Sequence, residues 1–181
     1  MTQEKEITIQ DVIERNHLKG DVVIGTLVDI LASSIGSLTN PTKLANTFTS
    51  NNIKTTDKTI STYIDYLTDA FMISKVQRYD IKGKKYINSP FKFYFTDIGI
   101  RNCRLNYRQQ EQTHIMENII YNELLIRGYN IDVGIIEHMT RNKNGKQQLV
   151  QLEVDFICNK GSNRYYIQSA FSIPDETKMI Q

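Results

Sequence analysis

The sequence predicts an α+β protein in two parts, a helical region with a β-hairpin followed by an α/β region. Three observations predict this. Between residues 22 and 71 the apolar residues recur at helical spacing. From residue 71 to 95, β-branched and aromatic residues flank a glycine turn, as in a hairpin. After residue 113, one long helical pattern precedes three segments typical of strands.

Two helices open the first part. The segment 22–35 spaces its apolar residues as a mostly buried helix does: Val23, Leu27, Ile30, Leu31 and Ile35. Thr39 or Asn40 can cap a second helix over 41–48. Pro41 suits the first position of that helix, because its missing N–H would have no helical partner there.

A third helix and a hairpin complete the first part. Thr55 or Thr56 can cap a helix whose apolar residues share one face: Ile60, Ile64, Leu67 and Phe71. With the preceding helix it forms a helix-turn-helix pattern. Gly83 lies at the hairpin turn, and the residues after Pro90 extend the strand pattern. Three helices followed by a hairpin is the winged-helix order.

The second part begins with helical segments. Asp97 can cap a short one, and Thr113 can cap a long one that ends at Gly128, where the C′ position requires a positive φ. Three strands separated by polar turns are then expected at 129–136, 149–158 and 164–172.

The chain therefore divides into a linker or helix over 1–19, which Gly20 can end, a winged helix over 20–96 and an α/β domain over 97–181. The final residues, 173–181, have the pattern of a first helical turn. A sheet with one helix has an uncovered face. We therefore expect a fragment of a longer protein, truncated at the C-terminal end of the second domain.

Polar side chains converge in the second domain. Gln151, Glu153 and Asp155 alternate with apolar residues and point to one face of their strand. Gln168 lies on the next strand, and Glu117 projects from the preceding helix. Mg²⁺ prefers carboxylate and carbonyl oxygens. Glu117, Asp155 and Glu153 could supply them, together with a backbone carbonyl near Gln168.

Three stretches of the sequence carry a family resemblance: "KFYFTDIGIRN", "MENIIYNELLIRGYNIDVG" and "LEVDFICNKGSNRYYIQ". In this order they resemble the winged-helix and PD-(D/E)XK nuclease-like region that follows the AAA-type ATPase module of many bacterial and archaeal proteins. The resemblance implies a restriction-endonuclease-like mixed sheet with flanking helices. It also implies that the partner is an ATPase module of the same full-length protein, that ATP binds only there, and that the protein is cytoplasmic.

Two features depart from that family. No GxxxxGK[ST] motif occurs in the chain, so an ATPase module would lie outside it. The lysine of the nuclease motif is replaced by Ala170, and Gln168 stands where an acid is commoner. A lysine there activates water and offsets phosphate charge. We expect an inactive scaffold with vestigial Glu117, Glu153, Asp155 and Gln168. A Mg²⁺-dependent nuclease using Glu117 and Asp155, or a merely solvated hairpin, are the alternatives.

Basic residues are concentrated in the hairpin. Residues 71–95 contain one acidic residue, Asp80, and six basic ones: Lys75, Arg78, Lys82, Lys84, Lys85 and Lys92. Such a patch favours phosphate contact. Asp57 and Asp65 lie on the outer face of the preceding helix, and their negative charges would repel phosphate groups. A DNA-binding regulator and a protein-docking module therefore both stay open. The candidate nucleic-acid contacts are Lys58, Arg78, Lys82, Lys84 and Lys85.

Composition excludes several other classes. The net charge of +2 comes from 22 basic and 20 acidic side chains, so only local patches could favour nucleic acid. Cys103 and Cys158 lack the spacing of a zinc site. The N-terminal residues have no apolar core of a signal peptide, and no apolar run reaches membrane-helix length. The expected function is accessory: to bind a nucleic acid or a protein for an ATPase, without a cofactor in this fragment.

Overall fold

The computed structural model describes residues 9–18, 21–108, 111–141 and 145–171. These residues form six α-helices and five strands, so the predicted α+β class is confirmed. The chain divides into two compact units. Unit 1 comprises Met1–Lys75 and Phe91–Gln110, and unit 2 comprises Val76–Pro90 and Glu111–Gln181.

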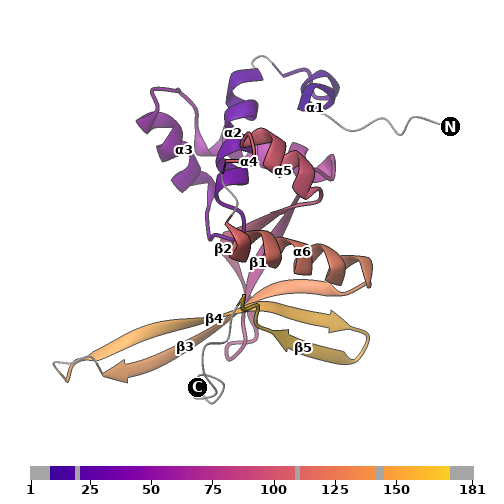
Figure 1. Cartoon of the computed structure of the whole chain (residues 1–181). Helices are drawn as coiled ribbons and strands as arrows, with labels where there is room; N and C mark the ends of the chain where they lie inside the picture. Colours follow the sequence, from indigo (N-terminus) through magenta and orange to yellow (C-terminus); the bar gives the residue numbers. More distant parts are fainter. Residues whose placement is uncertain (1–8, 19–20, 109–110, 142–144, 172–181) are drawn as a thin grey trace. The chain divides into compact units, whose positions relative to one another are not determined.

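Unit 1 is mainly helical (Figure 1). Its helices are α1 (Ile9–Arg15), α2 (Asp21–Ser33), α3 (Pro41–Ser50), α4 (Asp57–Asp69) and α5 (Ile98–Arg104). Two strands pass through both units, β1 (Ile73–Asp80) and β2 (Lys85–Phe95). The core contains fully buried side chains from α2, α3, α4 and β2: Leu27, Leu31, Phe48, Ile64 and Phe93.

The helix caps follow local sequence. Asn40 caps α3, because its Oδ1 accepts a hydrogen bond from the N–H of Lys43 at 2.7 Å, and Pro41 occupies the first helical position. Thr56 caps α4 in the same way, with its Oγ1 3.1 Å from the nitrogen of Thr59. Asp97 caps α5 as predicted. Of the two residues predicted as possible caps for each of α3 and α4, the second is the cap: Asn40 and Thr56.

The predicted boundary at residue 96 does not coincide with the division into units. Helix α5 lies in unit 1, where it packs on α2. Arg101 is 1% exposed, and its Nε donates to the carbonyl oxygen of Ala32 at 2.9 Å. Arg104 pairs with Asp29 at 2.8 Å. A long-range contact of this kind has no local sequence signal, whereas the strand-to-helix transition at Asp97 does.

Helix α4 ends with a residue of unusual conformation. Phe71 has φ 55°, and its N–H donates to Thr68 while the N–H of Met72 donates to Leu67. This is the Schellman motif, in which glycine usually occupies the C′ position because a Cβ is unfavourable there. The Phe71 side chain is 78% exposed.

We expect Phe71→Gly to stabilise unit 1 by about 1 kcal/mol, because it removes the αL strain and little buried surface. Urea denaturation of the two proteins measures the difference. Phe71→Ala is the control, since it removes the ring but keeps the Cβ. Equal stability of the glycine and alanine variants would contradict this explanation.

Unit 2 consists of α6 (Gln112–Ile126), β3 (Asn130–Arg141), β4 (Gln147–Lys160), β5 (Asn163–Ile167) and the tip of the β1–β2 hairpin. The strand order is β2-β1-β3-β4-β5. β1 pairs with β3 in parallel, and the β3–β4 and β4–β5 pairs are antiparallel. The sheet is therefore mixed, as predicted.

Several expected boundaries shift in unit 2. Gly128 does end α6, with φ 78° and its N–H donating to Leu125, so this prediction is confirmed. The Thr113 cap is wrong, because α6 begins at Gln112 and Glu111 makes no side-chain cap. β5 stops at Ile167, so Gln168 follows the strand. The predicted helix stop at Gly20 and the helical turn at 173–181 lie outside the described residues.

A β-bulge breaks the predicted alternation on β4. Asp132 pairs with Ile157 but Gly134 pairs with Val154, so Val133 faces two residues of β4. All four residues from Asp155 to Cys158 are buried, so burial does not alternate along this part of β4. Gly134 is needed beside the bulge, because a Cβ there would lie 2.9 Å from the Cβ of Val154.

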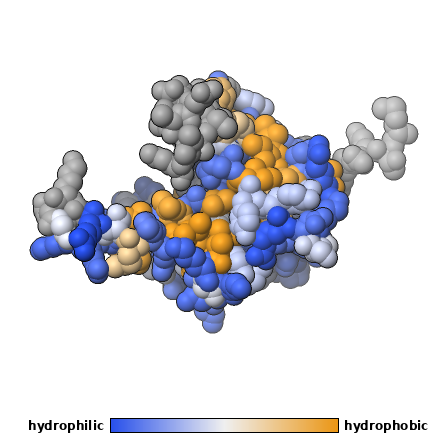
Figure 2. Space-filling view, turned by 90° about the horizontal axis from the view of Figure 1, so that it is seen from below, coloured by the Kyte–Doolittle hydropathy of each residue, from blue (hydrophilic) through white to orange (hydrophobic). Residues whose placement is uncertain are grey.

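Helix α6 packs on β3 and β4, where the rings of Tyr121 and Phe156 are 6.3 Å apart (Figure 1). Figure 2 shows hydrophobic residues gathered on the underside of the molecule. The exposed apolar side chains of the β3–β4 ribbon include Met139, Leu149 and Leu152.

Candidate functional site

The structure brings Asp155 and Gln168 together, as the sequence predicted. Asp155 is 7% exposed, and its Oδ2 accepts a hydrogen bond from Gln168 Nε2 at 2.9 Å. The same oxygen accepts from the backbone N–H of Ser169 at 2.8 Å and from its hydroxyl at 2.7 Å. The carboxylate therefore fastens the segment after β5 to β4.

Both the oxygen and the nitrogen of the Gln168 side-chain amide form hydrogen bonds with Asp155. Its Oε1 accepts from the backbone N–H of Asp155 at 3.3 Å, while its Nε2 donates to the carboxylate. An amide that coordinates a cation must turn its oxygen to the metal. In this arrangement the Gln168 oxygen accepts a hydrogen bond within the protein instead.

Glu117, on α6, and Glu153, on the same strand as Asp155, complete the predicted set. Glu117 is half-buried on α6, and Glu153 is exposed on β4. In the described part of the chain, no three His, Cys, Asp or Glu side chains are grouped so that they could hold a metal ion. The four predicted residues thus yield one tight pair rather than a cluster of acids.

A buried arginine lies in the same sheet, and the sequence reasoning had assigned it to the surface. Arg78 is 7% exposed on β1, and its Nη2 donates to Gln151 Oε1 at 3.0 Å. Gln151 in turn donates to Glu137 at 3.0 Å. Burial lowers the pKa of Arg78, whereas the charges of Glu153 and Glu137 raise it. Within the described ranges, its Nε has no hydrogen-bond partner.

The six hairpin cations separate into two groups. Arg78 and Lys92 are buried, and Lys75 lies over the ring of Phe91 at 4.3 Å. Lys82, Lys84 and Lys85 are exposed at the tip, in unit 2. Hence the tip carries the charge that a phosphate could reach, and Arg78 does not belong to that surface. The place of each residue in the folded hairpin, rather than composition, decides which of these cations face solvent.

The tip is ordered by hydrogen bonds between its backbone N–H groups and the side chain of Asp80. Asp80 Oδ1 accepts hydrogen bonds from the N–H groups of Lys82 and Gly83, at 3.1 and 2.9 Å. A Cβ on Gly83 would collide with the Asp80 carboxylate. Lys84 follows with φ 52°. Short-range contacts thus hold the three lysines on a tight turn.

The outer face of α4 has the composition expected from its sequence. Asp57, Lys58 and Asp65 are exposed, while Ile60, Ile64 and Leu67 are buried. Lys58 is therefore accessible, but it lies beside carboxylates that repel phosphate. This face is a weaker candidate for nucleic-acid contact than the hairpin tip.

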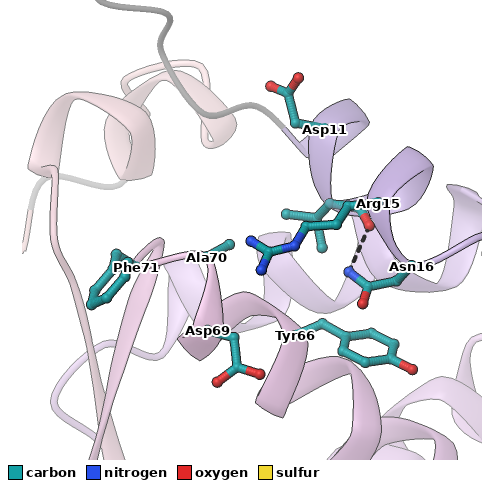
Figure 3. Close-up of a pocket in the computed structure, with 8 residues that line it drawn as sticks. Asp11, Arg15, Asn16, Tyr66, Asp69, Ala70 and Phe71 are labelled. Carbon is teal, nitrogen blue, oxygen red and sulfur yellow. Dashed lines mark hydrogen bonds between the residues drawn. The ribbon is translucent and has the colours of Figure 1, made fainter.

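Unit 1 has a hollow of about 300 Å³ between α1 and the end of α4 (Figure 3). Asp11 and Arg15 line it from α1, and Asn16 lines it just after that helix and donates to the carbonyl oxygen of Val12 at 2.9 Å. Asp69 and the exposed Phe71 line the opposite side. No sequence motif pointed to this hollow.

Neither cysteine belongs to these sites. Cys158 is buried on β4, and burial raises the pKa of its thiol to about 11, so it is a poor nucleophile at neutral pH. Cys103 is exposed on α5. In the described part of the chain, no helix combines the length and hydrophobicity that a membrane span requires.

Comparison with known proteins places the chain in a family. The family described as "Domain of unknown function (DUF8612)" matches residues 5–111, which is more than half of the chain. The chain belongs to this family. The match covers all five helices of unit 1 and the whole β1–β2 hairpin, so these elements are its shared part.

Two relatives extend over nearly the whole chain. An uncharacterized protein of Haemophilus influenzae is 35% identical over 171 residues, 94% of this chain and 40% of the relative. An uncharacterized protein of Methanocaldococcus jannaschii is 27% identical over 172 residues, 95% of this chain and 36% of the relative. The chain thus spans about two fifths of the curated relatives it matches. No solved structure matches it.

Proposed function

We propose that this chain is an accessory, partner-binding region of a longer AAA-type ATPase, and that it contacts nucleic acid without cleaving it. In this proposal unit 1 is a winged helix and unit 2 a restriction-endonuclease-like domain with a degenerate site. The relatives support the existence of further domains, because more than half of each lies outside the match. A GxxxxGK[ST] motif in the remainder of the full-length protein is the expectation for the ATPase.

Unit 1 has features that support the winged-helix assignment. Helices α2, α3 and α4 precede the β1–β2 hairpin. The loop before α3 also joins that hairpin, because Thr39 forms an isolated antiparallel bridge with Phe91, with both backbone hydrogen bonds at 2.9 Å. This bridge beside the hairpin supports the winged-helix assignment.

The observation that carries the non-catalytic assignment is the set of three hydrogen bonds to Asp155 Oδ2. A catalytic carboxylate must present its oxygens to the cation that activates water. Here Asp155 instead serves as a structural acceptor, and Ala170 replaces the basic residue of the motif. The site retains its framework but lacks two of the groups that phosphodiester cleavage needs.

The exposed lysines at the hairpin tip supply the proposed nucleic-acid contact. We expect binding of a fluorescent oligonucleotide to weaken steeply between about 50 and 200 mM salt. Each phosphate contact adds about 0.9 to the slope of log K against log salt, so the Lys84→Ala/Lys85→Ala double variant should lower the slope by roughly 2. Lys54→Ala, in the other unit, is the matched control and should leave it unchanged.

The same preparation tests catalysis. We expect supercoiled plasmid to remain intact with Mg²⁺ or Mn²⁺. Cleavage that disappears in Asp155→Asn would replace this proposal with the alternative of a metal-dependent nuclease. Absence of binding at low salt would remove the nucleic-acid function and favour docking to a protein.

A further inference from the structure

Unit 2 has a hollow of about 620 Å³ that the preceding site does not use. It is formed by the end of α6, the start of β3, the β4–β5 hairpin and one residue of β2. The side chains that matter for its chemistry are Tyr86, Tyr121, Tyr129, Asp132, Asn159 and Arg164. A volume of this size is ordinary for a small-molecule site.

Aromatic rings give the hollow its walls. Tyr86 is 56% exposed, and its ring meets Tyr79 edge-on with centroids 5.2 Å apart. Tyr129 meets Tyr165 in the same way at 5.9 Å. These contacts hold the rings in place while the hollow stays accessible. Exposed tyrosines at fixed positions provide stacking surfaces for nucleic-acid bases.

A carboxylate lies among the rings. Asp132 accepts a hydrogen bond from the Tyr86 hydroxyl at 3.3 Å. Asp132 is half-buried, and this burial raises the pKa of its carboxyl group. A ligand that donates two hydrogen bonds would stabilise such a carboxylate. The Watson–Crick edge of guanine offers two neighbouring N–H donors, and cytosine and adenine offer one amino group each.

Two cations lie beside the hollow and indicate the charge that a ligand would carry. The Arg164 guanidinium lies 5.3 Å from the Tyr79 ring centre, and its Nε donates to Asn159 at 2.7 Å. Lys160 lies 5.4 Å from the ring centre of Tyr129. Two cations beside one carboxylate disfavour a cationic ligand and favour one with a phosphate group.

We propose that this hollow binds an unpaired nucleotide, with its base between the tyrosines, a base amino group at Asp132 and its phosphate near Arg164. The inference rests on the proposed function, since the lysines of the hairpin tip immediately precede Tyr86 in the sequence and would bind the adjoining backbone. Single-stranded nucleic acid is the expected source of the base, and guanine is the base that fits the carboxylate best.

The test compares the intact chain with three oligonucleotides by fluorescence anisotropy at one salt concentration: a guanine-containing single strand, the same strand with abasic sites in place of guanine, and a duplex. We expect the abasic strand to bind roughly tenfold more weakly than the intact one, because one stacked base is lost. Tyr86→Ala should remove that difference and leave duplex binding unchanged. Tyr107→Ala, an exposed tyrosine of unit 1, should change neither.

Tyr86→Phe separates stacking from polar recognition, since it keeps the ring and loses only the hydroxyl bonded to Asp132. A titration with guanosine monophosphate, followed by saturation-transfer NMR, identifies the source of the base. Binding of the mononucleotide that depends on Tyr86, without a gain for the strand, would assign the hollow to a free nucleotide.

Equal affinity for intact and abasic strands, together with no binding of the mononucleotide, would overturn the inference. If the lysine variants still weakened oligonucleotide binding, the proposed nucleic-acid function would stand without a nucleotide site in the hollow. If no oligonucleotide bound at low salt, both would fail, and the lysine variants would then show no effect either.

Discussion

Asp155→Ala is expected to destabilise unit 2 by about 3 kcal/mol and to detach the segment that follows β5. The substitution leaves three donors of Gln168 and Ser169 without their acceptor. Each buried donor without a partner costs about 1–3 kcal/mol, and water can replace part of the loss because Gln168 is exposed. Urea denaturation followed by circular dichroism measures the global change.

Hydrogen exchange gives the local measurement for this prediction. The amide of Ser169 should lose most of its protection in Asp155→Ala and less in Asp155→Asn, which keeps one acceptor oxygen. Gln148→Ala is the control on the same strand, and its exposed side chain should change stability by less than about 0.5 kcal/mol. Similar effects of Asp155→Ala and Gln148→Ala would refute the structural role of Asp155.

Arg101→Ala is expected to destabilise unit 1 by about 3 kcal/mol, since it combines a cavity with an unsatisfied carbonyl group. Arg101 is among the largest fully buried side chains, and its Nε–H···O bond to Ala32 joins α5 to α2. Arg101→Met keeps much of the volume and loses the hydrogen bond, so about half of the effect should remain.

Helix α5 contains its own control for that experiment. Arg104 pairs with Asp29 at 2.8 Å, but the two side chains are 34% and 45% exposed. Exposed ion pairs contribute about 0–1 kcal/mol, so Arg104→Ala should have a small effect that falls further at high salt. If Arg104→Ala were as damaging as Arg101→Ala, burial would not be the reason for the importance of Arg101.

Local chemistry made much of the secondary structure predictable. Caps such as Asn40 and Asp97 act within a few residues, and Gly128 stops α6 through its own φ angle. Alternation predicted that Asp155 and Gln168 belong to neighbouring segments, and they are indeed hydrogen-bonded. These features depend on contacts between residues close in sequence or on adjacent strands, so the pattern of side chains is enough to reveal them.

The exposure of individual cations was not predictable in the same way. Arg78 and Lys85 look alike in the sequence of a basic hairpin, yet Arg78 is buried and Lys85 is exposed. The difference arises because β1 pairs with β3, which follows it by about fifty residues and reaches it only in the folded chain. The composition gives the number of charged residues, but it does not show which of their side chains become buried when a strand distant in sequence packs beside them.

The sequence alone was sufficient for the α+β class, for most of the helices and strands and for the expectation that Asp155 and Gln168 lie close together. Only the tertiary structure decided that α5 packs in unit 1, that Asp155 is buried beside Phe156, and that Tyr86, Tyr129 and Asp132 share one hollow. Caps, turns and alternation act over a few residues and are visible in the chain. Contacts between residues 40 to 80 positions apart depend on the packing of whole elements, which no short stretch of sequence contains.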